Sequence, residues 1–233
     1  MSRASLGHAV VTGSSAGIGG AMASALLAQG WRVSGLDVAP ASLSHAAFTP
    51  LTVNLADGAD IAPVAATLGP VDALVHAAGV MRVGPLGQLD HAGGELMWRL
   101  HVDAATRLAD ALVPGMAARG SGRVVFIGSR VAQGMPGRGQ YAATKAALLA
   151  MARSWAAEVA AQGVTVNVIS PAATATGMLQ DPARAASAPR VPPIGRLIEP
   201  AEIAALAAYL LSPAAAAITG QDIAICGGAS LPR

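Results

Sequence analysis

A tyrosine and a lysine lie four residues apart in RGQYAATKAAL, residues 138–148. Lys145 is the only lysine among fifteen Lys and Arg residues, and Tyr141 is one of two tyrosines. Residues four apart share a helix face, so the ammonium group can approach the phenol. A free tyrosine, with a pKa of about 10, is a poor base at neutral pH, and a nearby cation lowers that pKa. The alternative is a surface lysine, but Arg serves equally well at most exposed sites, and this chain uses Arg elsewhere.

Three glycines follow the first apolar run in VVTGSSAGIGGAM, residues 10–22. Gly13, Gly17 and Gly19 stand between a predicted strand and a predicted helix. Glycine permits a tight turn and a close approach of the backbone to a pyrophosphate, which the helix N-terminus then attracts. Any tight strand-to-helix turn favours glycine, so this pattern needs a second feature beside it.

Asp37 supplies that second feature at the end of the next predicted strand, in SGLDVAP. A carboxylate there can accept hydrogen bonds from an adenosine ribose diol, and it repels a 2′-phosphate. No Arg or Lys occurs in residues 13–20 or directly after Asp37 to offset that repulsion. A solvated turn aspartate is the alternative for Asp37 alone. Together with the glycines, it favours NAD over NADP.

Short β-branched runs alternate with long alanine-rich segments along the chain. Several of the runs are apolar without alternation, which is typical of strands covered on both faces. The pattern predicts a doubly wound parallel sheet with helices on both faces. Pro40 and Pro50 leave room for little more than one helical turn between the second and third strands. The predicted strands are 8–12, 31–37, 51–54, 71–78, 122–128, 163–170 and 221–226, and the predicted helices are 17–29, 90–118, 139–162 and 200–211.

Composition narrows the class of protein. With 233 residues, 53% hydrophobic and 12% charged, the chain suits one globular domain rather than a disordered segment. A net charge of +2 is too small for the basic surface that nucleic-acid binding requires. A single cysteine excludes an internal disulfide. Glu202 and Pro213 interrupt the most apolar stretch, and no signal peptide is evident at the start. We expect a cytoplasmic protein with a small-molecule substrate and no nucleic-acid, membrane or metal partner.

Five motifs, in order along the chain, resemble those of the short-chain dehydrogenase/reductase family. TGSSAGIG (12–19) is similar to its cofactor turn, HAAG (76–79) to the segment after its fourth strand, and YAATK (141–145) to its YxxxK signature. PAATATGM (171–178) resembles the segment beside the nicotinamide, and ITGQDIAICGG (218–228) the last strand. The resemblance covers the chain from end to end.

The resemblance implies one Rossmann-like domain over residues 1–233, with a seven-stranded parallel sheet. It implies an NAD-dependent oxidoreductase that interconverts a secondary alcohol and a ketone. Tyr141 would move the proton, Ser129 would hydrogen-bond the substrate oxygen, and Lys145 would tune Tyr141 and hold the nicotinamide ribose. A turn cap is the alternative for Ser129. The implied cofactor-binding residues are Gly13, Ser15, Gly17, Ile18, Gly19, Asp37, Asn54, Leu55, Ala77, Ala78, Gly79, Tyr141, Lys145, Pro171, Thr174 and Thr176.

The chain departs from the family at its fourth catalytic position, an Asn in the helix after strand four. Counting back from LVPGM (112–116) puts His101 there, and His76 replaces the first Asn of the NAAG motif. We therefore expect His101 in the site, as a group that titrates between about pH 6 and 7. The alternative is that His101 faces solvent. A second hypothesis follows from these changes: an NAD(H)-binding sensor or scaffold with low turnover.

Two further expectations concern the substrate side and assembly. Residues 177–195 lack periodicity, and a loop of that length is either a substrate-side lid or a plain surface connection. Arg130 and Arg138 flank the catalytic segment and are either substrate contacts or solvated. Helices 90–118 and 139–162 are rich in alanine, and the family resemblance implies that they pair into a dimer or tetramer. Alanine-rich composition is the alternative explanation.

Overall fold

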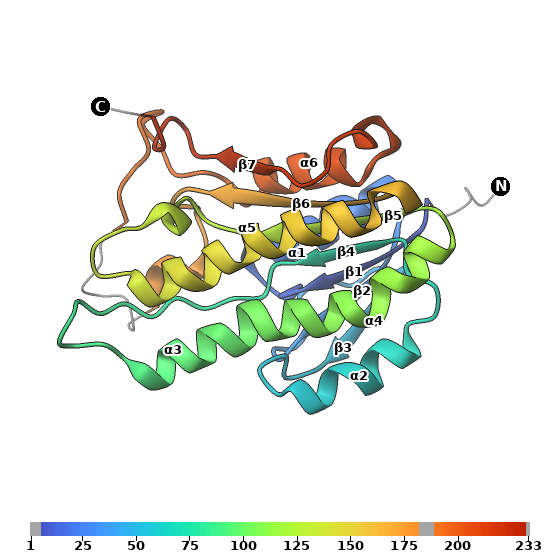
Figure 1. The fold of residues 1–233 in the computed structure, drawn as a ribbon, viewed down its shortest axis with the longest axis horizontal. Helices are drawn as coiled ribbons and strands as arrows, with labels where there is room; N and C mark the ends of the chain where they lie inside the picture. Colours follow the sequence, from blue (N-terminus) through green and yellow to red (C-terminus); the bar gives the residue numbers. More distant parts are fainter. Residues whose placement is uncertain (1–5, 182–188, 232–233) are drawn as a thin grey trace.

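The computed structural model describes residues 6–181 and 189–231. Its seven strands form one parallel sheet in the order β3-β2-β1-β4-β5-β6-β7, which confirms the predicted fold class. Figure 1 shows the strands running side by side through the middle of the molecule. The strands are β1 (His8–Thr12), β2 (Arg32–Asp37), β3 (Phe48–Thr52), β4 (Ala73–His76), β5 (Gly122–Ile127), β6 (Val164–Pro171) and β7 (Asp222–Ile225).

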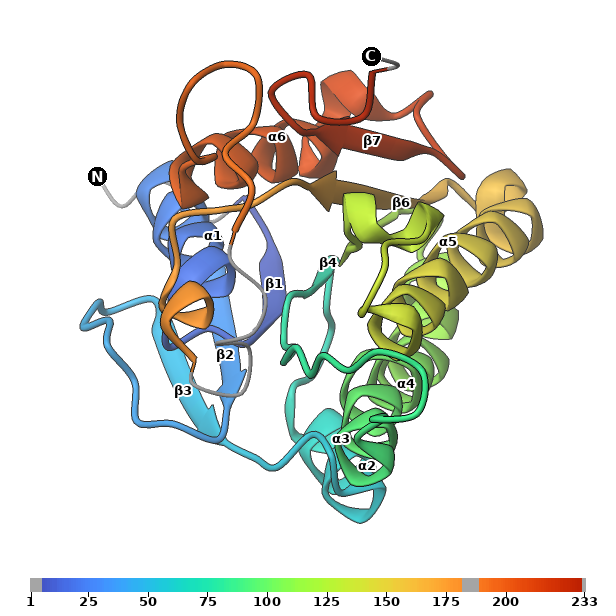
Figure 2. The ribbon, with the colours of Figure 1, turned by 90° about the vertical axis from the view of Figure 1, so that its left-hand side faces the viewer.

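Helices cover both faces of this sheet (Figure 2). On one face α1 (Gly17–Gln29) packs beside α6 (Pro200–Leu211). On the other lie α2 (Gly58–Thr67), α4 (Ala104–Ala118) and α5 (Gly139–Val159).

Neighbouring strand residues belong to different cores. Val10 and Val124 pack with α4 and α5, whereas Val11 and Val125 pack with α1 and α6. Consecutive side chains of a strand point to opposite faces, so a strand buried on both faces needs an unbroken apolar run.

Two elements differ from their predictions. The third strand is Phe48–Thr52 rather than 51–54, and it contains Pro50. Because β3 is an edge strand, the missing N–H of a proline costs it no ladder bond. Helix α2 was not predicted, and it contains Pro63. Its start is set by Asp57, whose side chain accepts a hydrogen bond from the Ala59 N–H at 3.1 Å.

The predicted helix 90–118 exists but is interrupted. It begins as α3 (His91–Trp98), widens into a π-helical turn at Arg99–Asp103, and continues as α4. A π turn inserts one extra residue and redirects the side chains that follow, and such turns are frequent at functional sites. His101 lies at the centre of this one.

The strand order reverses beside β1, which pairs with β2 on one side and β4 on the other. In open parallel sheets, ligands bind beyond the carboxyl ends of the strands at such a switch point. Among the described residues, no helix is long and apolar enough to cross a membrane.

Candidate active site

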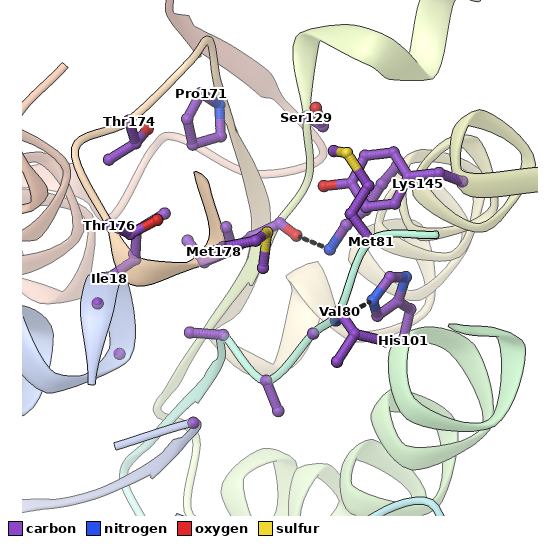
Figure 3. Close-up of a pocket in the computed structure, with 18 of the residues that line it drawn as sticks. Ile18, Val80, Met81, His101, Ser129, Lys145, Pro171, Thr174, Thr176 and Met178 are labelled. Carbon is purple, nitrogen blue, oxygen red and sulfur yellow. Dashed lines mark hydrogen bonds between the residues drawn. The ribbon is translucent and has the colours of Figure 1, made fainter. Parts of the chain in front are cut away.

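A cleft of about 980 Å³ opens at the carboxyl ends of β1, β4, β5 and β6. All but one of the predicted site residues line it. The exception is Ser15, whose hydroxyl donates to the Ala39 carbonyl at 3.1 Å. Figure 3 shows Ser129, Lys145 and His101 on one side of the cleft, with Ile18, Thr174 and Thr176 on the other.

The glycine turn between β1 and α1 leaves no room for side chains. A Cβ on Gly19 would lie 2.2 Å from the Gly13 carbonyl oxygen, and one on Gly13 would lie 3.0 Å from the Ala78 backbone. Gly17 has φ +55°, in the left-handed region, and faces the Thr176 methyl. The turn is therefore a bare backbone surface at a helix N-terminus, which is the form a pyrophosphate needs.

Asp37 ends β2 beside this turn. Its Oδ2 accepts from the Ser15 N–H and its Oδ1 from the Ala39 N–H, both at 2.9 Å. The carboxylate is thus fixed at the edge of the cleft. Asn54 and Leu55 line the same end, and the Asn54 Oδ1 accepts from the Ala56 N–H at 3.1 Å.

The far side of the cleft is closed by the segment after β6. Pro171, Thr174 and Thr176 line the cleft, and the Thr174 hydroxyl donates to the Ala172 carbonyl at 3.0 Å. A short 3₁₀ turn, Gly177–Gln180, follows. The predicted loop 177–195 continues through residues 182–188, which lie outside the described residues, and its part from Pro189 to Val191 again lines the cleft.

Tyr141 and Lys145 project from one face of α5, as their spacing predicts. Tyr141 is 6% exposed and Lys145 5%, and the Lys145 Nζ lies 5.8 Å from the centre of the Tyr141 ring. Nζ donates to the Ile127 carbonyl at the end of β5, at 2.8 Å (Figure 3). Burial lowers the pKa of Lys145 to about 7, so this ammonium can lose its proton near neutral pH.

Ser129 follows β5 and also lines the cleft. Its Oγ accepts from the Val131 N–H at 3.1 Å, which caps the 3₁₀ turn Arg130–Gln133. The turn-cap interpretation of Ser129 therefore applies. That bond uses a lone pair of the hydroxyl and leaves its hydrogen for another acceptor, so a role toward a substrate oxygen stays a prediction.

His101 lies inside the site, fully buried. Its Nε2 accepts from the Val80 N–H at 3.1 Å, and its Nδ1 lies 2.9 Å from the Thr144 hydroxyl. That hydroxyl donates to the Tyr141 carbonyl, so Nδ1 must carry the hydrogen. The ring also meets the Tyr141 ring edge-on, at 5.7 Å between centres.

The expectation that His101 titrates between pH 6 and 7 is wrong. Burial first, and then the positive charge of Lys145, hold its pKa well below 6.5. Protonation at Nε2 would also break the bond from Val80. His101 is therefore a neutral hydrogen-bonding group, and the alternative that it faces solvent is excluded as well.

A second buried histidine connects β4 to the π turn. The Thr12 hydroxyl accepts from the Ala77 and Ala78 N–H groups, each at 3.0 Å, so its own hydrogen points to His76 Nδ1 at 3.0 Å. The Nε2–H then donates to the Leu100 carbonyl at 3.1 Å. Burial lowers the pKa of His76 to about 3, so this ring is neutral too.

Gly79 lines the cleft beside His101 and Lys145. A Cβ there would lie 2.9 Å from the His101 Nε2 and 3.8 Å from the Lys145 Nζ.

Among the described residues, no three His, Cys, Asp or Glu side chains lie together as a metal site.

Known proteins resemble this chain along most of its length. A family model described as enoyl-(acyl carrier protein) reductase matches residues 13–230. The 3-oxoacyl-[acyl-carrier-protein] reductase FabG of Vibrio cholerae is 34% identical, over 94% of this chain and 96% of its own. The 2-keto-3-deoxy-L-fuconate dehydrogenase of Xanthomonas campestris is 32% identical, over 94% of this chain and 78% of its own. A solved short-chain dehydrogenase/reductase family protein superimposes with a TM-score of 0.88 at 34% identity, covering 98% of this chain and 99% of that one.

The chain belongs to the short-chain dehydrogenase/reductase family. It is an oxidoreductase of that family, whose members bind a nicotinamide cofactor. Within this dehydrogenase/reductase, His101 and His76 stand where the sequence analysis placed family Asn residues. His101 accepts with Nε2 and donates with Nδ1–H, as an amide accepts with its oxygen and donates with its nitrogen.

Sequence reasoning missed three features of this dehydrogenase/reductase site. Thr12 and Thr144 orient the two histidines, and Ala229 and Leu231, near the end of the described chain, line the cleft. Thr12 directly precedes the glycine turn and Thr144 directly precedes Lys145. These positions next to functional motifs could have indicated that both hydroxyls belong to the site. Nothing in the sequence pointed to Leu231.

Proposed function

We propose that this protein transfers a hydride between NAD(H) and the carbon of a secondary alcohol or ketone, using Ser129, Tyr141 and Lys145. The single observation that supports this most is the placement of the only lysine. Lys145 is buried beside Tyr141, at the end of the cleft opposite Asp37. Burying an ammonium is costly, so a chain that otherwise uses Arg has a functional reason to keep one here.

The cofactor fits the residues of the cleft. The bare glycine turn suits a pyrophosphate, Asp37 an adenosine ribose, and Lys145 a second ribose near the reaction centre. When bound, the nicotinamide supplies or accepts the hydride. The carboxylate of Asp37 has no cationic neighbour in residues 13–20 or 38–57 to hold a 2′-phosphate, which supports NAD over NADP.

The chain's own residues manage the proton. The Tyr141 hydroxyl gives its proton to the ketone oxygen during reduction and takes it back during oxidation. The Ser129 hydroxyl donates a hydrogen bond to the same oxygen and fixes its position. A charged Lys145 stabilises the phenolate by its positive field. Acid–base catalysis of this kind contributes about 10²–10⁴-fold to a rate.

Assembly and location also belong to this proposal. We expect a homo-oligomer, a dimer or tetramer, that pairs through α4 and α5, because their outward faces carry mostly small side chains, among them Ala111, Ala143, Ala146 and Ala150. A monomeric mass by light scattering at micromolar concentration would contradict it. A cytoplasmic location and a lid role for residues 177–195 stay predictions.

A screen of substrates, in which oxidation or reduction of the nicotinamide cofactor is measured, tests the function. Purified protein is assayed with alcohols and ketones, each with NAD(H) and NADP(H), against Tyr141→Phe as the matched variant. We expect turnover with NAD(H) that Tyr141→Phe reduces by about 10²-fold or more. Tight NAD(H) binding without turnover on any compound would favour the sensor or scaffold hypothesis instead.

A further inference from the structure

An apolar cluster contains Tyr141 and is separate from both large cores. This Tyr141 cluster consists of buried residues that pack together: Met81, Met97, Val131, Tyr141 and Ala142. The two large cores instead fill the space between the sheet and its helices. Partly buried apolar residues pack against the Tyr141 cluster and also line the cleft: Val80, Met135 and Met178. Because Met81 and Val131 line the cleft too, the cluster forms part of the surface that a ligand meets.

The backbone on both sides of Met81 is held in place. The Val80 N–H donates to His101 Nε2 at 3.1 Å, and the Arg82 N–H donates to the sulfur of Met97 at 3.3 Å. Met97 is itself fully buried in α3. Because both neighbouring amides are bonded, the chain fixes the point from which the Met81 side chain enters the cleft.

Val131 is fixed next to Ser129. Its N–H donates to the Ser129 Oγ at 3.1 Å, and its side chain is buried. Figure 3 shows the Met81 side chain extending toward Ser129. A carbonyl oxygen held by the hydroxyls of Ser129 and Tyr141 would therefore place its substituent against apolar side chains.

Charged side chains line the cleft as well, but they are less deeply buried than Met81 and Val131. Apart from Asp37 and Lys145, the charged residues of the described lining are partly buried or exposed: Arg130, Arg138, Asp181 and Arg190. A long arginine side chain can lie along apolar surface while its charged end stays in water. The buried surface next to Tyr141 is therefore apolar, and a strongly hydrated substituent would lose water on entering it.

We propose that the substrate is an uncharged ketone or secondary alcohol whose larger substituent is apolar, and that Met81 and Val131 bind this substituent beside Tyr141. This inference names the substrate class of the proposed function and rests on it. Removal of the substituent from water is the driving force. Methionine side chains are unbranched and adaptable, so the Tyr141 cluster suits chains and rings alike.

Methyl ketones of increasing chain length, from butanone to nonanone, test the inference. They are assayed with the nicotinamide cofactor that supports turnover. We expect kcat/KM to rise by up to about fourfold for each added methylene, or about 0.8 kcal/mol, until the apolar surface is covered. Levulinate and levulinamide match heptanone in size but are charged and polar. Each should have a kcat/KM at least about tenfold below that of heptanone, or about 1.4 kcal/mol.

Variants locate the effect. Met81→Gln keeps the length of the side chain but ends it in an amide, so the nonanone-to-butanone ratio of kcat/KM should fall by about fivefold or more. Met81→Leu stays apolar and should keep the ratio within about twofold of the parent. Val131→Thr adds a hydroxyl at nearly constant shape and should also lower the ratio, which gives the test if Met81→Gln does not fold.

Met151→Gln is the matched control, since Met151 is partly buried on α5 and does not line the cleft. Circular dichroism spectra matching the parent show which variants are folded. A ratio that falls as far in Met151→Gln as in Met81→Gln would overturn the assignment of the contact to Met81.

The outcomes separate the two proposals. Turnover with a kcat/KM that does not rise with chain length, or that is as high for levulinate or levulinamide as for heptanone, overturns the substrate class and leaves the function standing. If no ketone is turned over, the proposed function is contradicted, and calorimetry on the cofactor-loaded protein tests the apolar site alone. Nonanone that binds at least about tenfold tighter than butanone then supports the site, whereas equal or unmeasurable binding overturns it.

Discussion

The inner wall of the cleft and the rim around Asp37 are built in opposite ways. On or directly behind the inner wall, His101, His76 and Lys145 are 0%, 1% and 5% exposed, and burial lowers the pKa of all three. At the rim, Asp37 is half-buried and is held by two backbone N–H groups. The wall opposes positive charge, whereas the rim presents a negative charge near water. Changes in the wall should therefore alter both stability and rate, and changes at the rim should alter cofactor choice alone.

Lys145→Met tests the wall with the largest expected effect. Activity should fall by about 10²–10⁴-fold, since the cation that stabilises the phenolate is lost. Stability should rise, because Met fills a similar volume without a buried charge. The folded pKa of Lys145 is about 7, below the unfolded value of about 10.4, so the unfolded chain binds more protons between these values. The free energy of unfolding that Lys145→Met gains over the parent is therefore largest below pH 7 and shrinks as the pH rises toward 10.

Urea unfolding of both proteins at pH 6 and pH 10 measures this difference in the free energy of unfolding. A variant that is less stable than the parent at pH 6 would show that Lys145 is stabilised by its bond to Ile127 more than it is penalised by burial.

The two histidines should make the inner wall sensitive to acid. Their pKa values are lowered in the folded chain, so below about pH 6.5 the unfolded chain binds more protons and stability falls with the pH. Each buried ring adds up to about 1.4 kcal/mol per pH unit to that loss, down to its folded pKa. For His76 the loss continues to about pH 3.

His76→Asn combined with His101→Asn should flatten the dependence of unfolding free energy on pH between 6.5 and 4. The control is His91→Asn, at the exposed start of α3. Parallel curves for the double variant and the parent would mean that the rings acquire their protons without unfolding the wall.

Asp37→Ala tests the rim. The parent protein should bind NADH at least about tenfold tighter than NADPH, a difference of about 1.4 kcal/mol, because the carboxylate binds the ribose diol and repels a 2′-phosphate. The variant should lose most of that preference while its thermal stability changes little. Fluorescence titration of both cofactors measures it, and equal or tighter NADPH binding by the parent would refute the NAD assignment.

The same contrast separates what the sequence could predict from what it could not. The rim is local, since three glycines and Asp37 follow each other along β1, α1 and β2, and their types alone reveal the arrangement. The position of His101 was also predicted, by counting along the helix. Its neutral state was not, because it depends on Val80, Thr144 and Lys145 closing around the ring. Strand β3 and helix α2 differ from the sequence expectation for a related reason. Each contains a proline, which an edge strand and a short surface helix tolerate, and sequence alone does not tell which elements are edges.

His101→Asn should have the smallest effect and tests whether the wall is neutral. An amide can accept from Val80 and donate to Thr144 as the imidazole does, so kcat should stay within about tenfold of the parent. Because His101 does not titrate near neutrality, the profile of kcat against pH should keep the same ionisations in both proteins, including any near pH 7 that belongs to Lys145. Thr144→Val should do more harm than His101→Asn, since it leaves the Nδ1–H buried without its acceptor. If instead an ionisation between about pH 6 and 7 disappears in His101→Asn alone, the ring gains a proton during turnover and the inner wall is not neutral.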